Sequence, residues 1–303
     1  PWLSPVLDKN PGILNDFFWP DGHIRVTGRE YNGLLESACY QRGEMSCTSC
    51  HSMHKSDPDD QLARGMRGNR ACLQCHDEMA GNITAHTHHA ADSLGSNCTN
   101  CHMPHTSYGL LKAIRGHTIE TPDVATTLET GRPNACNLCH LDKTLDWTAG
   151  QLAKRTGQVK PTVPEEHRTT AASVLWLLKG DAGQRALAAW HMGWKPALEA
   201  SGSGWQSPLL AELLDDPYSA VRYMAHKALT RQPGFDDFEY DFVAGETSRL
   251  ARREAALAKW TLSTHNTPTH PNTLLLDTDG QRLTNKVRQL IETRDNHPMR
   301  LRE

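Results

Sequence analysis

One short phrase occurs four times in the first half of the chain and constrains the fold more than any other feature. It consists of two cysteines separated by two residues, with a histidine directly after the second cysteine. The cysteine pairs are Cys47 and Cys50, Cys72 and Cys75, Cys98 and Cys101, and Cys136 and Cys139, and the histidines are His51, His76, His102 and His140. Cysteines at this spacing lie on one helical turn, where both thiols can form thioethers with a single haem. The adjacent histidine then becomes the proximal ligand of the iron.

Other uses of paired cysteines fit this pattern poorly. One copy of the phrase would arise by chance only about 0.015 times, given nine cysteines and 17 histidines in the chain. Zinc sites do not require a histidine directly after every second cysteine. A thioredoxin-like redox pair would occur once, and a disulfide scaffold would not repeat one local phrase. Cys39 lies outside the four copies, and we expect it to be a buried thiol or else half of an intermolecular disulfide.

Histidines are concentrated around the four motifs, where they can supply the second axial ligand of each iron. Ten of the 17 histidines fall between positions 51 and 140. We expect the distal ligands to be His54, His86, His89 and His117, with His88, His105 and His23 as alternatives. With this surplus every iron can be bis-histidine, six-coordinate and closed to substrates, which is typical of an electron carrier.

Spacing restricts which iron some of these histidines can reach. His54 follows His51 by three residues, so on a continuing helix the two side chains share one face. An imidazole cannot reach over the haem whose proximal ligand is so close, and His54 must therefore ligate a neighbouring iron. The same spacing relates His86 and His89, which can serve two different irons. These constraints predict haems that lie close together, as electron hopping requires.

Composition limits what else the first half can be. Only 38% of the 303 residues are hydrophobic, which is a small supply for a packed core unless porphyrins add apolar mass. The formal net charge of −3 provides no basic surface that would favour nucleic acid. No apolar run of about 18 residues predicts a membrane span. The chain begins at Pro1 without a signal-peptide pattern, from which we expect a processed N-terminus.

The second half contains no cysteine beyond the fourth motif, and its pattern is helical. We expect a tetrahaem domain over 1–147, a connector over 148–168 and an α-helical domain over 169–303, which together make the fold class mainly α and loop-rich around the haems. Helices are predicted over 31–40, 108–115, 145–156, 169–179, 184–194 and 284–294, and Asp181 is a predicted N-cap. Apolar faces over 209–214 and 221–229 flank Asp216-Pro217, and this pattern resembles a HEAT repeat. Such repeats stack helix pairs and present a long docking surface.

Residues 21–147 resemble multihaem cytochromes c of the nitrite reductase and hydroxylamine oxidoreductase lineage, including proteins with doubled motifs. The matching segments are Cys47–His54, His86–His89, Cys98–Pro104 and Arg132–His140. The resemblance implies that His54, His86 and His89 ligate neighbouring haems. No copy has lysine in place of the proximal histidine, as a catalytic haem of this lineage often does. The motif count is also similar to that of tetrahaem subunits of extracellular cytochrome filaments.

These observations predict electron transfer through four covalent haems c, with redox proteins as partners and no catalytic residue. We expect the protein to be exported to the periplasm or the cell exterior. Its helical half is expected to join a polymer or a respiratory complex. The alternative is a reductase of nitrite, hydroxylamine or a similar small oxyanion, which needs one iron with an open position. The surplus of distal histidines favours the carrier.

Overall fold

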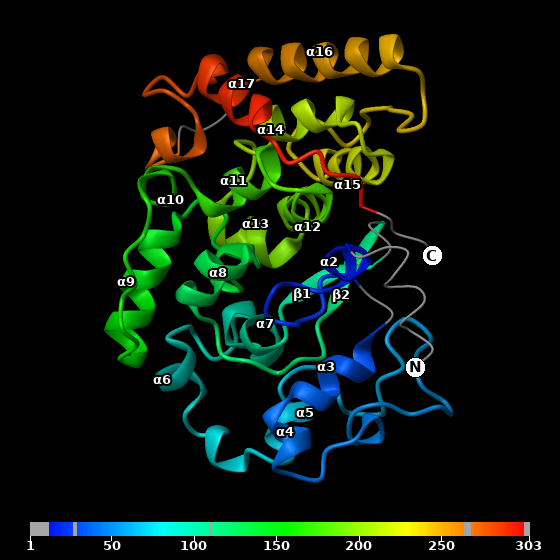
Figure 1. The fold of residues 1–303 in the computed structure, drawn as a ribbon, viewed down its shortest axis with the longest axis vertical. Helices are drawn as coiled ribbons and strands as arrows, with labels where there is room; N and C mark the ends of the chain where they lie inside the picture. Colours follow the sequence, from blue (N-terminus) through cyan, green and yellow to red (C-terminus); the bar gives the residue numbers. More distant parts are fainter. Residues whose placement is uncertain (1–11, 27–28, 109–110, 264–267, 300–303) are drawn as a thin grey trace. The chain divides into compact units, whose positions relative to one another are not determined.

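The chain is divided into two compact units in the computed structural model, which describes residues 12–26, 29–108, 111–263 and 268–299 (Figure 1). The larger unit comprises Pro1–Thr27, Thr106–Ile114 and Asp123–Glu303, and the smaller unit comprises Gly28–His105 and Arg115–Pro122. Helices, turns and loops make up almost all of the described residues, so the predicted mainly α fold class is confirmed.

The larger unit contains the helices of the second half of the chain. Its α-helices are α2 (Ile13–Phe17), α8 (Val124–Thr130), α9 (Leu145–Thr156), α10 (Glu165–Thr169), α11 (Ala172–Leu178), α12 (Ala182–Met192), α13 (Lys195–Ser201), α14 (Ser207–Glu212), α15 (Ser219–Leu229), α16 (Glu246–Leu262) and α17 (Thr284–Glu292). Its 3-10 turns are η4 (Cys136–Leu138), η5 (Leu213–Asp215) and η6 (Pro271–Leu274). Two short strands, β1 (His105–Tyr108) and β2 (Lys112–Arg115), pair with each other.

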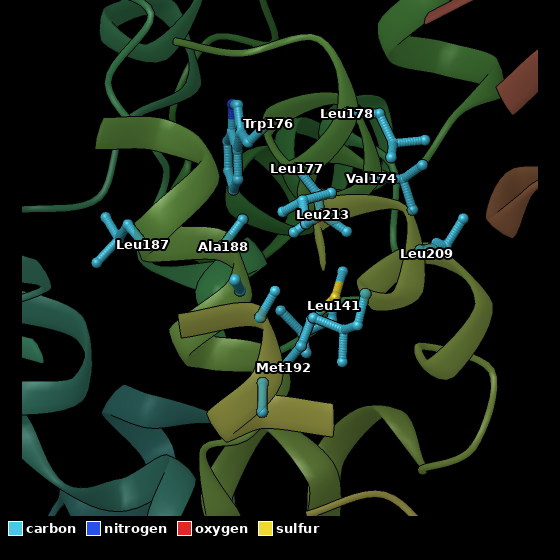
Figure 2. Close-up of a cluster of buried hydrophobic side chains, with 14 of the residues drawn as sticks. Leu141, Val174, Trp176, Leu177, Leu178, Leu187, Ala188, Met192, Leu209 and Leu213 are labelled. Carbon is cyan, nitrogen blue, oxygen red and sulfur yellow. The ribbon is translucent and has the colours of Figure 1, made fainter. Parts of the chain in front are cut away.

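Aliphatic side chains at helical spacing form the core of the larger unit (Figure 2). Helix α12 packs against α11 and α15, and α14 packs against α15 and α16. Leu177, Leu209 and Leu213 are completely shielded from water between these helices. Each such leucine contributes roughly 2 kcal/mol through the apolar surface that it buries. The packing of these helices therefore stabilises the larger unit.

Capping residues define where several of these helices begin and end. Asp181 accepts a hydrogen bond from the Gln184 amide at 3.0 Å, and the Gln184 side chain accepts one from the Asp181 amide, so α12 begins with a capping box. Thr144 caps the start of α9, and Gly157 ends it in the left-handed conformation. The helices that the sequence predicts at α9, α11, α12 and α17 are confirmed, with ends shifted by up to three residues.

A buried ion network fixes the turn between η5 and α15. The Asp216 carboxylate is fully buried and lies 2.8 Å from Arg185 Nε and 3.0 Å from Arg294 Nη1. It also accepts a hydrogen bond from the Tyr218 amide at 2.8 Å. Two guanidinium groups and one amide thus satisfy a carboxylate that would be costly to bury alone. The Asp216-Pro217 break in the helical pattern is held in place by these contacts.

The smaller unit consists of short helices joined by loops and has almost no hydrophobic core. Its elements are α3 (Glu30–Glu36), α4 (Ala38–Gln41), η1 (Cys47–Ser49), α5 (Arg70–Leu73), η2 (Asp77–Met79), α6 (Ile83–Thr87), η3 (Leu94–Ser96) and α7 (Cys98–His102). Leu34, at 7% exposure, is the one buried hydrophobic side chain among the described residues of this unit. Domains with so little apolar burial need cross-links, metals or cofactors to be stable.

Two helices expected in the first half differ in the structure. The helix predicted over 108–115 is wrong, because the described residues at both ends of this segment belong to the paired strands β1 and β2. Thr106 in β1 also donates a hydrogen bond to the Arg25 carbonyl at 2.7 Å, a long-range contact that helix propensity does not anticipate. The helix predicted over 31–40 is divided at Ser37, whose hydroxyl accepts a hydrogen bond from the Tyr40 amide and so begins α4.

The compact units also divide the chain differently from the boundaries expected at residues 147 and 168. The fourth cysteine motif belongs to the larger unit and not to the smaller one. The reason is burial: Leu138, within the motif, and Leu141, directly after it, are packed among the helices of the larger unit. Figure 2 shows Leu141 in the cluster of buried side chains, together with Met192.

Candidate haem sites

Each cysteine motif folds as one tight helical turn, which brings its two thiols and its imidazole together. The amide of the proximal histidine donates a hydrogen bond to the carbonyl of the first cysteine in three motifs. The distances are 2.9 Å from His51 to Cys47, 3.0 Å from His76 to Cys72, and 2.8 Å from His140 to Cys136. The third motif forms α7. The six cysteines of the first three motifs are free thiols, so no disulfide competes for their sulfurs.

Side chains tie the first three motifs to one another within the smaller unit. Gln74, in the second motif, donates a hydrogen bond to the Ser49 carbonyl of the first motif at 3.0 Å. Asn69 precedes the second motif, donates to the Ser96 carbonyl at 2.8 Å and accepts from the Cys98 amide of the third motif at 2.9 Å. The three motifs therefore form one continuous cluster.

The thiols of neighbouring motifs are close enough to affect one another. Burial raises the pKa of Cys72 to about 12, and Cys98 of the next motif acts in the same direction. Burial also raises the pKa of Cys50, with Cys75 of the next motif as the second cause. Each thiol is therefore uncharged at neutral pH, as a thioether sulfur would be. The electrostatic contacts agree with the clustering of the three motifs.

His117 lies opposite the proximal histidine of the first motif. The ring centroids of His51 and His117 are 6.0 Å apart and their planes are inclined by 27°. The Nδ1 atom of His117 is 3.1 Å from the Arg115 carbonyl, which assigns the proton to Nδ1 and leaves Nε2 as the ligating atom. Burial lowers the pKa of His117 against the opposing effect of Glu30, so the imidazole is neutral at pH 7, as a metal ligand must be.

A second pair of imidazoles faces across the third motif. His86, at the end of α6, lies with its ring centroid 5.9 Å from that of His102, and the two planes are inclined by only 14°. His102 Nδ1 is 2.7 Å from the Glu120 carbonyl, which again directs Nε2 to the metal side. His86 and His102 thus repeat the arrangement of the first pair.

The spacing of both pairs fits an iron atom between them. A histidine nitrogen binds a first-row metal at about 2 Å, so two imidazoles on opposite sides of one metal place their ring centroids about 6 Å apart. In each pair one ring, His117 or His102, also has Nδ1 held by a carbonyl, which leaves its Nε2 for a metal. The residues of the smaller unit therefore fit two bis-histidine haems, one on the first motif and one on the third.

The other histidines expected as ligands have different surroundings. His89 Nδ1 is 2.7 Å from the Thr87 carbonyl, and its ring lies directly beside Gly95, where a Cβ would come within 2.4 Å of the His89 ring. His54 and His76 are exposed, and neither makes a ring contact within the described part of the chain. Distal ligands for the second and fourth motifs thus remain predictions from the sequence.

The fourth motif is anchored firmly in the larger unit. Asn137 is completely buried, accepts a hydrogen bond from Thr148 at 2.7 Å and donates one to the Lys143 carbonyl at 3.0 Å. The ring of His140 lies 5.2 Å from that of Trp147, which places an aromatic surface beside this site. Helix α9 and the motif are thereby held as one piece.

Several residues that orient the candidate ligands carry no signal in the sequence. Arg115 donates hydrogen bonds to the Thr99 carbonyl at 3.0 Å and to the side chain of Asn100, and so holds α7. The carbonyls of Arg115 and Glu120 orient two imidazoles, but any residue type has a carbonyl. Asn69 could have been found only as an N-cap-like residue, since asparagine side chains favour such contacts.

Comparison with known protein families supports the assignment of the first two cysteine motifs as haem-binding motifs. Residues 40–81, which include the first two motifs, match the family model described as the doubled CXXCH motif. The motifs indicate covalent binding of c-type haem. No curated protein and no solved structure matches the chain. Within the described residues, no helix has the length and apolar character needed to cross a membrane.

Proposed function

We propose that this protein transfers electrons through four covalently bound c-type haems, one on each motif. The observation that carries the proposal is the two pairs of neighbouring imidazoles, His51 with His117 and His86 with His102, whose ring centroids are about 6 Å apart in each pair. When bound, such haems supply one-electron Fe(III)/Fe(II) couples. The chain supplies two thioether sulfurs, two imidazoles and the hydrogen bonds that orient them. Axial ligands on both sides close an iron to substrates, which favours a carrier over an enzyme.

The packing of the smaller unit supports the same conclusion. Leu34 is its one buried hydrophobic side chain in the described residues, and three of the four motifs lie in this unit. Three porphyrins would supply the apolar mass that the chain lacks, and their covalent attachment would cross-link the loops. We further propose that His54 and His89 are also distal ligands of haem irons.

The exposed position of His76 favours one alternative. Its ring makes no aromatic contact within the described residues, and its nearest ion pair is with Glu78 at 3.7 Å. If the second iron had no distal ligand, it could bind a small oxyanion such as nitrite, and the protein would be a reductase. The distal histidine candidates of the sequence outnumber the four irons, so the carrier is the stronger proposal.

The location and partners of the protein follow from the same chemistry. Covalent haem attachment takes place outside the cytoplasm, so we propose an exported protein of the periplasm or the cell exterior. The paired helices α11 with α12 and α14 with α15 are consistent with a HEAT-like stack that could dock a redox partner. A polymer or a respiratory complex is the assembly that this surface would serve, with Cys39 or His23 as residues that could reach a neighbouring subunit.

The proposal is tested by haem stoichiometry and iron spin state in the same sample. Intact mass should give four haems per chain, and the low-temperature EPR spectrum of the oxidised protein should contain low-spin ferric signals alone. His86→Ala should convert one haem per chain to high spin without loss of covalent haem. The comparison variant is His88→Asn, two residues further along at a left-handed position that asparagine tolerates; a high-spin haem in His88→Asn but not in His86→Ala would assign the ligand to His88 instead. A high-spin haem in the unmodified protein would instead favour the reductase.

A further inference from the structure

A glycine in α3 lies against the backbone of the segment that carries His117. A Cβ added at Gly33 would lie 2.8 Å from the amide nitrogen of Thr118 and 3.0 Å from the carbonyl carbon of His117. Both are backbone atoms, which cannot turn aside as the end of a side chain can. Gly33 is itself buried. The helix and the segment are thus in contact at a distance that only glycine permits.

The segment in question is Arg115–Pro122, which we call the ligand strap. It orients axial ligands of two different irons. The Arg115 carbonyl accepts a hydrogen bond from Nδ1 of His117 at 3.1 Å, and the Glu120 carbonyl, five residues further along, accepts one from Nδ1 of His102 at 2.7 Å. The Glu120 amide also donates to the His102 carbonyl at 3.0 Å, and the Gly116 amide donates to the Pro104 carbonyl at 2.9 Å. The strap is therefore tied to the third motif through Gly116 and Glu120, and α3 contacts it at His117 and Thr118.

We propose that Gly33 is a positioning residue for His117, because its missing side chain sets how closely the ligand strap approaches α3. The proposal rests on the proposed function, since it needs an iron between His51 and His117. Glycine is a poor residue for the middle of a helix, and alanine would favour α3 on its own. Gly33→Ala should therefore favour helix α3 itself while displacing the strap. A change at the iron in this variant can then be assigned to the strap and not to a weaker helix.

The effect of a methyl group at this position follows from the contact distances. A Cβ at 2.8 Å from a backbone nitrogen is closer than real Cβ contacts, so α3 or the strap must move by some tenths of an ångström. The other end of the strap is held by the hydrogen bonds to His102 and to Pro104. The displacement is therefore concentrated at His117, and its bond to the first iron is weakened more than any other.

The experiment compares two glycine-to-alanine variants of the full haem-loaded protein. Gly33→Ala should retain four covalent haems by intact mass and should show a high-spin ferric signal in EPR, up to one haem per chain. Addition of free imidazole should remove this signal, because the ligand can occupy the position that His117 leaves. The matched control is Gly81→Ala in the same unit, where an added Cβ meets nothing within 4 Å, and its spectrum should equal that of the unmodified protein.

A second pair of variants makes the outcome decisive. Thr118→Ile adds bulk to the same contact from the side of the strap, because Thr118 Oγ1 lies 3.0 Å from the position that a Cβ of residue 33 would occupy. It should produce the same high-spin haem, and it replaces Gly33→Ala in the comparison if that variant is obtained with fewer than four haems. His117→Ala removes the imidazole itself and gives the largest high-spin signal expected from the loss of this ligand. If His117→Ala gives a high-spin haem while Gly33→Ala and Thr118→Ile stay low-spin, the role of Gly33 is refuted and the proposed function stands. If His117→Ala also stays low-spin, the ligand assignment fails and the proposal falls with it.

Discussion

Replacing Asp216 by asparagine tests whether the buried ion network holds the helical core together. Asp216→Asn preserves the shape of the side chain and the oxygen that accepts from the Tyr218 amide. It removes the negative charge that faces Arg185 at 2.8 Å and Arg294 at 3.0 Å. Arg185 is only 1% exposed, so its charge would have no partner and no water to replace the carboxylate.

The size of the effect follows from the burial of these groups. Removing one partner of a buried ion pair costs about 3–5 kcal/mol of folding free energy, because an unpaired charge remains inside. The neighbouring Asp215 is a matched control, since it pairs with Arg249 at 3.3 Å and the two side chains are 20% and 18% exposed. Asp215→Asn should cost about 1 kcal/mol or less, as more accessible pairs do. The two variants should therefore differ by about 3 kcal/mol.

The assay is urea unfolding of the haem-loaded protein, followed by circular dichroism at a wavelength that reports helix. With a slope of about 3 kcal/mol per molar urea for a chain of this size, Asp216→Asn should unfold at a urea concentration about 1 M lower than Asp215→Asn. Equal midpoints for the two variants would refute the view that this network, and not general charge, fixes the Asp216-Pro217 turn. A large fall in the urea midpoint of both variants would show that Asp215 and Arg249 do not behave as a solvent-accessible ion pair.

Two further predictions follow from single contacts. Asn69→Ala should increase hydrogen exchange at the Cys98 amide about fivefold to tenfold, because it removes a hydrogen bond of about 1 kcal/mol. Asn69→Asp keeps the acceptor and should retain the protection of this amide. Unchanged exchange in Asn69→Ala would contradict the hydrogen bond between the second and third motifs. Burial raises the pKa of Tyr240 to about 12, above its value of about 10 in the unfolded chain, so its contribution to stability is complete below pH 10 and is lost as the pH rises toward 12. Thermal unfolding should therefore depend less on pH between 10 and 12 in Tyr240→Phe, which lacks the hydroxyl that donates to the Leu214 carbonyl. An identical pH dependence in the two proteins would argue against a partly buried, hydrogen-bonded tyrosine.

Features that depend on residues close together in the chain could be predicted from the sequence. The cysteine motifs are of this kind, because one helical turn decides where the two thiols and the imidazole lie. The same holds for α9 and α12, whose ends are set by Thr144, Gly157 and Asp181 within one turn of the helix. The mainly α fold class followed from the period of the apolar residues.

Features that depend on contacts between distant residues could not be predicted. The segment after His105 forms a strand and not a helix, because pairing with β2 and the contact of Thr106 with Arg25 outweigh local propensity. Local pattern also did not group the fourth motif with the helical half, since its packing involves α11, more than 30 residues further along the chain, as well as the nearby α9.

The sequence by itself determined which residues can bind haem, because covalent attachment and proximal ligation need residue types at fixed local spacing. It also named His117 and His86 among the candidates for the distal positions, but it could not pair them with particular irons. Only the tertiary structure set His117 opposite His51 and His86 opposite His102. The physical reason is that the two rings of each pair belong to distant segments of the chain, and their positions depend on backbone contacts such as that of Gly33 with Thr118, which residue types alone do not reveal.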